Sequence, residues 1–382
     1  MEVMIDRQQM IRAFSSLVFS TFNTASSSMR FEIINSKMAA LYTCAGTFAN
    51  RANIPIELIP DIIPEDTAFT VMADGILSFI QTIPSDFICL RASDKKLRIR
   101  GEWGNGNFLD QTYATSEVKV PKADELLGDH KVLGTCNSSI LSEALRYAKG
   151  LSTKDDVDHC RIGVKDGMML YVDETKVGAF KAPDVLPNMN ITTKEIGSIN
   201  TFLGNYKNEI IKVMRIGGDK GYAFQAPDGS VIMYGLKESD SGFNLGKGFD
   251  LNMECPITFE IELKSLLGTF AMLKTNASQL YDEMNIGVNT SGHLTITKEP
   301  SFNSRFTITP KTLDSDVDLT LQFSNLANVL RAFPKCDIAV IGIDPEHKKL
   351  RVETSVKILV GGGDDKATAE CRIINVLSYW NK

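Results

Sequence analysis

The feature that most constrains this chain is a short apolar pattern that recurs six times along its 382 residues. The pattern is an apolar residue, two spacers and then two apolar or small residues, which lie together on one face of a helix. Its copies begin 58 to 68 residues apart, so six units of about 62 residues account for nearly the whole length. The copies are Phe14-Leu17-Val18, Ile76-Phe79-Ile80, Leu141-Ala144-Leu145, Ile199-Phe202-Leu203, Leu267-Phe270-Ala271 and Leu326-Val329-Leu330.

The sequence around each copy predicts the same set of strands. A short strand-like run precedes most of the helices, as at 68–71 and 257–261. Two or more such runs follow each helix, and in two units they are joined by Asp166-Gly167 or Asp228-Gly229. Asp-Gly favours a tight hairpin between strands. Each unit is therefore predicted to hold one helix and about four strands, in the order βαβββ.

Two polar stretches predict how the six units are grouped. Residues 110–129 carry many charges, and residues 237–256 are rich in Gly, Ser and Asp. If both are linkers, the chain has three domains of two units each, at 1–118, 130–240 and 255–382. The predicted fold class is α+β with antiparallel sheets. A propeller is excluded because its blades are about 40–50 residues long and contain no helix.

Charge is segregated between the predicted helices and the rest of the chain. The net charge of -6 argues by itself against a nucleic-acid partner. The six helices with their flanks nevertheless carry +7 over 95 residues, which leaves -13 on the other 287. Lysine and arginine are either ordinary solvated helix residues here, or they form a surface that faces a polyanion. In the second interpretation the DNA-binding residues are Arg7, Arg12, Arg146, Lys149, Lys154, Lys194, Lys207, Lys264, Lys274, Arg331 and Lys335.

The sequence contains no recognisable catalytic or metal-binding motif. Its four histidines are isolated, and none of its glycine clusters has the P-loop or Rossmann spacing. The acidic runs 155–158 and 314–318 are predicted to be solvated loops rather than cation sites. Seven cysteines without a C-x-x-C pair indicate reduced thiols in the cytoplasm, and there is no apolar run long enough for a membrane span. We therefore predict no enzymatic activity, catalytic residue, metal or cofactor.

The segment Leu141 to Leu151, followed by the strands from Cys160 to Val172, resembles the T4-type phage member of the DNA polymerase sliding clamps, the processivity factors. The three-domain length is similar to that of the bacterial β-type clamps. In this family each clamp domain is two βαβββ units, and six domains close a ring with helices lining the hole and antiparallel sheets outside. The resemblance implies a head-to-tail homodimer that encircles double-stranded DNA without sequence preference.

The resemblance also implies partners and a place of action. Such a ring tethers the replicative DNA polymerase, is placed on DNA by a clamp loader, and works in the bacterial cytoplasm or in a phage-infected host cell. A different hypothesis is a repeat-built structural or assembly protein, for example of a virus particle, whose helices form subunit contacts. A carboxylate–metal hydrolase is a third. If the protein is a clamp, Arg146, Lys149, Arg331 and Lys335 are expected to face the central hole. If these side chains are instead scattered over an outer surface, the structural-protein hypothesis is favoured.

The family resemblance further implies a groove for a partner peptide between the second and third domains. Residues 173–177 are similar to an Asp-Gly-His-Arg-Leu segment of the family but lack its Gly-His-Arg, and residues 374–380 replace a Met-Pro-Met-Arg-Leu tail. The predicted groove residues are Thr175, Lys176, Val177, Leu350, Val352, Ile374, Asn375, Val376 and Leu377. The alternative to a role in the groove is that Val177, Leu350 and Val352 are ordinary buried core residues of their strands. Tyr379 and Trp380 belong either to a packed tail or to the groove.

Overall fold

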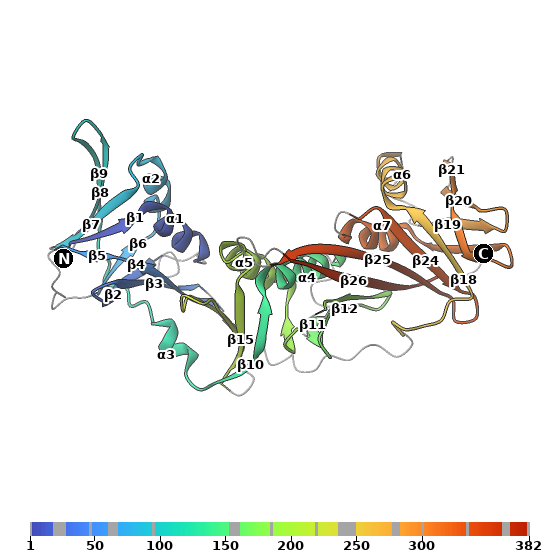
Figure 1. The fold of residues 1–382 in the computed structure, drawn as a ribbon, viewed down its shortest axis with the longest axis horizontal. Coiled ribbons are helices and arrows are strands. Elements are labelled where there is room, and N and C mark those ends of the chain that lie inside the picture. The colour runs from blue at the N-terminus through green and yellow to red at the C-terminus, as the bar shows by residue number, and fades with distance from the viewer. Residues whose placement is uncertain are drawn as a thin grey trace. The chain divides into compact units, whose positions relative to one another are not determined.

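The computed structural model divides the chain into two compact units. The first comprises residues 1–138 and 197–240, and the second comprises residues 139–196 and 241–382. Figure 1 shows the helices and strands of both units and labels most of them. The residues whose structure is described are 2–17, 28–45, 48–59, 68–93, 96–152, 161–183, 186–217, 221–235, 250–276, 283–298, 302–333, 336–360 and 367–379.

The order βαβββ occurs six times, which confirms the predicted repeat. The copies are β1 (Glu2–Asp6), α1 (Arg7–Ser16), β2 (Ser28–Asn35), β3 (Met38–Ala45), β4 (Phe48–Pro55); β6 (Ala68–Met72), α2 (Ile76–Thr82), β7 (Phe87–Ser93), β8 (Lys96–Gly104), β9 (Asn107–Ala114); β10 (His130–Asn137), α4 (Ser138–Leu151), β11 (Arg161–Lys165), β12 (Met168–Val172), β13 (Lys176–Lys181); β14 (Met189–Ile191), α5 (Thr193–Asn205), β15 (Ile210–Ile216), β16 (Gly221–Gln225), β17 (Val231–Gly235); β18 (Ile257–Glu262), α6 (Leu263–Asn276), β19 (Glu283–Asn289), β20 (His293–Lys298), β21 (Phe302–Thr307); and β23 (Val317–Gln322), α7 (Phe323–Ala332), β24 (Ile338–Asp344), β25 (Lys349–Val360), β26 (Ala367–Ser378). Between copies lie β5 (Glu57–Leu58), α3 (Ala123–Leu127) and β22 (Thr309–Thr312).

Neighbouring repeats exchange their first strands. β1 of the first repeat pairs with β7 of the second, and β6 of the second pairs with β2 of the first. The third and fourth repeats are joined in the same way by β10–β15 and β14–β11, and the fifth and sixth by β18–β24 and β23–β19. All of these pairings are antiparallel. Because each repeat needs its neighbour to complete a sheet, the exchange supports the grouping of six repeats into three pairs.

The last strand of a repeat decides how far each sheet extends. β4 pairs with β17 inside an eight-stranded sheet, and β13 pairs with β26 inside a nine-stranded sheet. The two other last strands, β9 and β21, lie at the edges of the five-stranded and four-stranded sheets. Among the described strands, therefore, two last strands of six have one neighbour only.

The stretches predicted to be linkers contain ordered, partly buried residues. Residues 110–129 include the end of β9 and the short helix α3, whose Ala123 is fully buried. Of residues 237–256, only 250–256 are described, and Leu251 and Met253 are buried there. The eight-stranded sheet joins strands from both sides of residues 110–129. The three domain ranges themselves stay a prediction.

The helices of the first two repeats cover one face of their sheets. Val3 and Ile5 of β1 share an apolar cluster with Phe14 of α1 and with Ile76 and Ile80 of α2. Burial alternates along β1 because successive strand side chains point to opposite faces. The other face of the five-stranded sheet consequently carries the intervening side chains.

The first helix ends earlier than its apolar pattern predicts. The Asp6 side chain accepts a hydrogen bond from the backbone N–H of Gln9 at 2.8 Å and caps the start of α1. The helix ends at Ser16, and Leu17 is extended. Leu17 is buried all the same, so it joins the core from outside the helix. Val18 lies outside the described residues.

In α6 the buried face differs from the predicted triplet Leu267-Phe270-Ala271. Ala271 is exposed and Leu267 is half-buried. The buried face is instead formed by Leu263, Leu266, Phe270 and Leu273. The prediction was wrong here because apolar residues are so dense in this helix that their spacing fits two neighbouring faces. The triplets of α2, α4, α5 and α7 lie within their helices, as predicted.

Gly178 on β13 provides a test of the packing between α4 and the nine-stranded sheet. A Cβ atom at this position would lie closer than 3.0 Å to Tyr147, Leu151 and Asn375. We expect Gly178→Ala to lower the free energy of unfolding by about 1–3 kcal/mol through overpacking. The matched control is Gly268→Ala on α6, where an added Cβ meets no atom within 4 Å; it should stabilise by about 0.4–1 kcal/mol. Urea unfolding measures both, and equal effects would contradict this account.

Candidate nucleic-acid interface and peptide groove

Seven of the predicted DNA-binding side chains are exposed, and five of these form no ion pair with a carboxylate of the described residues. Each of the five lies on the solvent side of a helix or just after its end, while most apolar residues of the same helix are buried. Such exposed cations could contact phosphate without reading bases. The five residues are Lys149, Lys194, Lys207, Lys264 and Arg331.

The amphipathic pattern of α4 explains why its basic residues face solvent. Ile140, Leu141, Ala144, Leu145 and Ala148 are buried. Arg146 lies opposite this buried face, and Lys149 lies at its solvent edge; both are exposed. Lys149 lies in the last turn of α4 and Arg331 in the last turn of α7. Cations there also interact favourably with the helix dipole. The solvated-helix interpretation and the DNA interpretation therefore both fit these two positions.

Three other predicted cations are engaged within the chain. Arg12 forms an ion pair with Glu209 at 3.1 Å, and its guanidinium lies 4.5 Å from the centroid of the Tyr206 ring. Arg146 pairs with Glu143 one turn earlier on α4. Arg7 is half-buried. The first two residues therefore offer a partly neutralised charge to any external phosphate.

The remaining three predicted cations cannot be placed as side chains. Lys154 and Lys335 lie outside the described residues, and Lys274 lies in α6 without a described side chain. The prediction that they contact DNA is untested.

The predicted groove residues lie on or beside three adjacent strands of the nine-stranded sheet, β13, β26 and β25. Val177 of β13 is directly opposite Val376 of β26, and Leu350 of β25 is directly opposite Leu377. The structure thus brings together residues nearly 200 positions apart in the sequence. Eight of the nine side chains are buried, and that of Thr175 is half-buried.

Three of these residues face away from the helices. Val177, Ile374 and Val376 belong to an apolar cluster that also contains Leu251 and Met253. This cluster lies on the outer face of the sheet. It is the part of the predicted groove whose side chains share one surface.

Four other predicted groove residues belong to the core between the strands and the helix. Asn375 accepts a hydrogen bond from the hydroxyl of Tyr147 on α4 at 2.7 Å, so it faces the helix side. Val352 is directly opposite Asn375 in the register and therefore shares its face. The same alternation puts Leu350 and Leu377 on that side. These four side chains fill the core between α4 and the sheet.

The sequence analysis missed Leu251 and Met253, which lie in the stretch predicted to be a linker. Both are buried against the outer face of β12, β13 and β26. Arg351 donates a hydrogen bond to the Met253 carbonyl at 2.7 Å and holds the segment in place. The only signal in the sequence is the alternation of two apolar residues with polar ones just before Pro256.

The turn between β12 and β13 is organised around Asp173. Its carboxylate accepts hydrogen bonds from the backbone N–H of Thr175 and the hydroxyl of Tyr171, and pairs with the buried Lys176 ammonium at 2.8 Å. Burial alone raises the pKa of Asp173, but the hydrogen bond and charge of Lys176 outweigh it and leave that pKa below its ordinary value. The Lys176 ammonium is thus paired with the Asp173 carboxylate inside the turn.

Tyr379, which the sequence assigned either to a tail or to the groove, is buried against the β24–β25 turn. Its hydroxyl donates a hydrogen bond to the Asp344 carbonyl at 3.2 Å. Tyr379 is therefore part of a packed end. Trp380 lies outside the described residues.

The described residues contain no cluster of three or more His, Cys, Asp or Glu side chains that could hold a metal ion. In the acidic run 314–318, Asp316 accepts a hydrogen bond from the backbone N–H of Thr290 at 2.7 Å. The run 155–158 lies outside the described residues. No helix in the described part of the chain is long and apolar enough to cross a membrane.

The fold that these six βαβββ repeats form is shared with solved structures of DNA polymerase beta subunits and sliding clamps. Over 100% of both chains, this protein is similar to the crystal structure of the beta subunit from DNA polymerase of Streptococcus pyogenes (13% identity, TM-score 0.75) and to that of DNA polymerase III subunit beta from Pseudomonas aeruginosa (13%, 0.74). The DNA polymerase III beta subunit of Thermotoga maritima matches with 11% identity and TM-score 0.73, over 100% of this chain and 99% of its own. No family model and no curated protein matches the sequence.

Removing the Lys176 ammonium tests the buried turn. We expect Lys176→Met to lower the free energy of unfolding at pH 7 by about 3–5 kcal/mol, because it leaves the Asp173 carboxylate buried and unpaired. Lys181→Met, at an exposed position of the same strand, is the control and should change little. Urea unfolding at a series of pH values measures the difference.

The destabilisation caused by Lys176→Met should also depend on pH. Because the folded-state pKa of Asp173 is lowered, its stabilising contribution is present above its ordinary value of 3.8 and is lost as the pH falls through the folded value. The difference between the native chain and Lys176→Met should therefore shrink as the pH falls through this range. A difference that stays constant would show that Asp173 does not carry the effect.

Proposed function

We propose that this protein is a sliding clamp, a non-enzymatic ring that encircles double-stranded DNA and tethers a DNA polymerase for processive synthesis. The observation that carries the proposal is the full-length match of the six-repeat fold to DNA polymerase beta subunits and sliding clamps. A repeat-built assembly protein has no comparable support. The partners of the clamp are then a DNA polymerase, a clamp loader and a second copy of the chain, in the cytoplasm.

The free last strands support closure of a ring. Inside the chain, last strands pair antiparallel with each other, β4 with β17 and β13 with β26. β9 and β21 are the last strands at sheet edges, and an edge strand is a template for pairing with another chain. Pairing β9 of one copy with β21 of the next repeats the internal joint. Two copies joined head to tail in this way use both edges of each chain.

The basic helix surfaces support sequence-independent contact with DNA. Lys149, Lys194, Lys264 and Arg331 are exposed on four different helices, each of which buries an apolar face. A small number of scattered cations attracts phosphates through counterion release but reads no bases. This arrangement suits a ring that holds DNA and slides along it.

The predicted peptide groove is proposed at the outer face of β13 and β26. Val177, Ile374 and Val376 are buried in the apolar cluster beneath this face, with the half-buried Thr175 at its rim. The segment containing Leu251 and Met253 packs on the same cluster and forms a wall. A short polymerase or loader peptide with apolar side chains would extend this cluster.

Charge reversal tests the DNA contact. The protein is threaded onto linear duplex DNA, the ends are blocked with bulky proteins, and the retained protein is counted. We expect retention only with blocked ends. Lys149→Glu with Arg331→Glu should reduce retention and lower the slope of log affinity against log salt by about two. The control Lys357→Glu, on the exposed outer side of β25, should behave as the native chain; equal losses would assign the effect to net charge alone.

Added lysines test the ring joint. Thr112 on β9 and Asn303 on β21 are exposed at the two proposed edges. We expect Thr112→Lys with Asn303→Lys to weaken dimerisation by about tenfold or more, because like charges on paired strands repel and lysine blocks edge pairing. Sedimentation measures the dimer, and Ser355→Lys on the interior strand β25 is the control. A dimer that tolerates both edge lysines would overturn the β9–β21 joint.

A further inference from the structure

An aromatic pocket of about 760 Å³ lies on the outer face of the five-stranded sheet. Phe87, Trp103 and Phe108 line it with 56%, 58% and 50% of their surface exposed, respectively. The Arg100 guanidinium stacks on the Phe108 ring, 3.5 Å from its centroid, and holds that ring in position. Large apolar side chains exposed together in one place mark an interaction surface more often than ordinary protein surface.

Carboxylates outnumber cations in the lining of this pocket. Glu2, Asp86 and Glu102 face one guanidinium, that of Arg100. Glu2 accepts a hydrogen bond from the Cys89 thiol at 3.2 Å, and burial with this bond raises the pKa of Cys89 to about 12, so the thiol is neutral. Asp86 and Glu102 are exposed and form no ion pair with the described residues. The pocket therefore favours a cationic occupant and disfavours phosphate.

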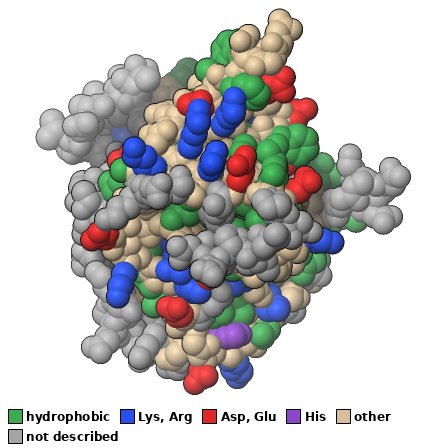
Figure 2. All heavy atoms as spheres, turned by 90° about the vertical axis from the view of Figure 1, so that its left-hand side faces the viewer, with side chains coloured by type: hydrophobic (Ala, Val, Ile, Leu, Met, Phe, Trp, Pro, Cys, Tyr) green, Lys and Arg blue, Asp and Glu red, His purple; other side chains and the backbone are tan. Residues whose placement is uncertain are grey.

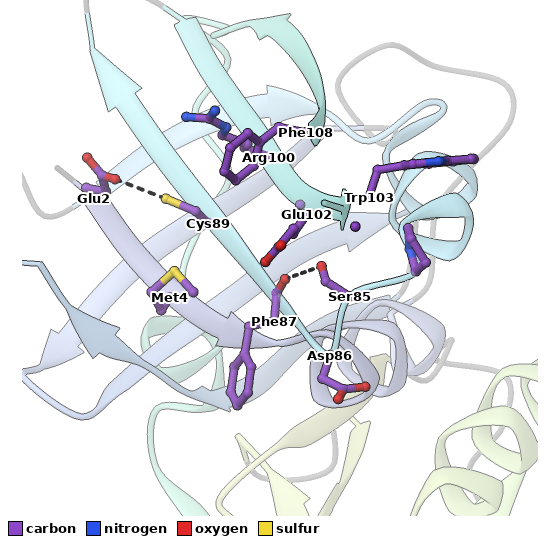
Figure 3. A pocket seen from close by; sticks show the side chains of 13 residues that line it. Glu2, Met4, Ser85, Asp86, Phe87, Cys89, Arg100, Glu102, Trp103 and Phe108 are labelled. Atoms are coloured by element: carbon purple, nitrogen blue, oxygen red, sulfur yellow. Dashed lines mark hydrogen bonds between the residues drawn. The ribbon is translucent and has the colours of Figure 1, made fainter. Parts of the chain in front are cut away.

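The geometry places the negative charge among the aromatic rings. Figure 3 shows the Glu102 side chain in the middle of the pocket, between Phe87, Trp103 and Phe108. A basic residue next to an apolar one would satisfy both kinds of lining at once. Other cations of the same sheet face do not change this balance, because Arg98 is paired with Asp110 and Arg91 is outside the lining. Figure 2 shows a face of the molecule on which charges of both signs lie among exposed hydrophobic side chains.

The internal repeat indicates what kind of molecule this face accepts. β8 and β9 of the second repeat correspond to β12 and β13 of the third, since both pairs are the last two strands of a βαβββ unit. Near the turn of each hairpin, Glu102 is paired with Phe108 in the second repeat and Val172 is paired with Val177 in the third. In the third repeat this outer face is covered by a segment of the chain itself.

That covering segment is a short stretch of chain with alternating apolar side chains. Leu251 and Met253 pack on Val172 and Val177, and Arg351 holds the Met253 carbonyl. The equivalent face of the second repeat is where Phe87, Trp103 and Phe108 remain exposed. A short stretch of chain with apolar side chains is thus what the fold already accepts on the equivalent face.

We propose that the pocket of β1, β7, β8 and β9 is a second docking site, for an extended peptide of a partner protein that carries an aromatic or aliphatic anchor next to basic residues. The anchor packs between Phe87 and Trp103, and the basic side chains pair with Asp86 and Glu102. This site is separate from the groove on β13 and β26.

Fluorescence anisotropy with a labelled synthetic peptide tests the site. The probe is a twelve-residue peptide with three lysines and two phenylalanines in a glycine–serine background, added to the full-length chain. We expect saturable binding that is weakened by about tenfold or more in Glu102→Lys and in Trp103→Ala, and largely kept in Trp103→Phe. Glu125→Lys, an exposed carboxylate of α3 outside the pocket, is the control for net charge and should bind as the native chain does.

A charge swap separates this site from non-specific attraction. A second probe, with glutamates in place of the lysines, should bind the native chain poorly and bind Glu102→Lys better than it binds the native chain. Because Glu102 and Trp103 are exposed, thermal unfolding of the variants should match that of the native chain. The proposal is overturned if the lysine probe binds all variants equally, or if a single-stranded oligonucleotide binds the pocket and the peptide does not.

Discussion

The pairing of strand edges between repeats is the constraint on which the rest of this structure depends. A single βαβββ unit leaves backbone N–H and C=O groups unpaired, and these groups must find partners when they are buried. The repeats meet this need by exchanging first strands, as β1 and β6 do, and by joining last strands, as β4 and β17 do. Among the described strands, the last strands β9 and β21 lie at sheet edges without such a partner, and these are the edges at which the ring joint is proposed.

Strand pairing also separates the two kinds of surface that the proposed function needs. Helices cover one face of the sheets, and their solvent sides carry Lys149, Lys264 and Arg331. The opposite faces are available for proteins, and the repeat uses them in two ways. At β12 and β13 the chain covers its own apolar cluster with residues 251–253, whereas at β8 and β9 the aromatic rings stay exposed. Different side chains on one scaffold thus leave one outer face covered and another exposed.

Local patterns predicted most of the repeat but not its ends and faces. Buried positions 3 and 4 residues apart identified α4, α5 and α7, because helical periodicity is a property of neighbouring residues. The end of α1 at Ser16 and the exposed Ala271 of α6 were missed, since tertiary packing decides where an apolar run leaves the helix. The sequence-based prediction of the groove did not separate Val177, which lies on the outer face of the sheet, from Leu350, which lies on the helix side. Their strands are adjacent, but only the register places them on opposite sides of the sheet.

The amino-acid sequence by itself determined the number of repeats, their order of helices and strands, and the basic character of the helices against an acidic remainder, because each of these is written in residues close together along the chain. Only the tertiary structure decided which strands pair, that Lys176 is used by Asp173, and that Phe87, Trp103 and Phe108 meet in one pocket. Backbone hydrogen bonds between distant strands leave no mark in residue type. The faces that they bring together therefore exist only once the sheets have formed.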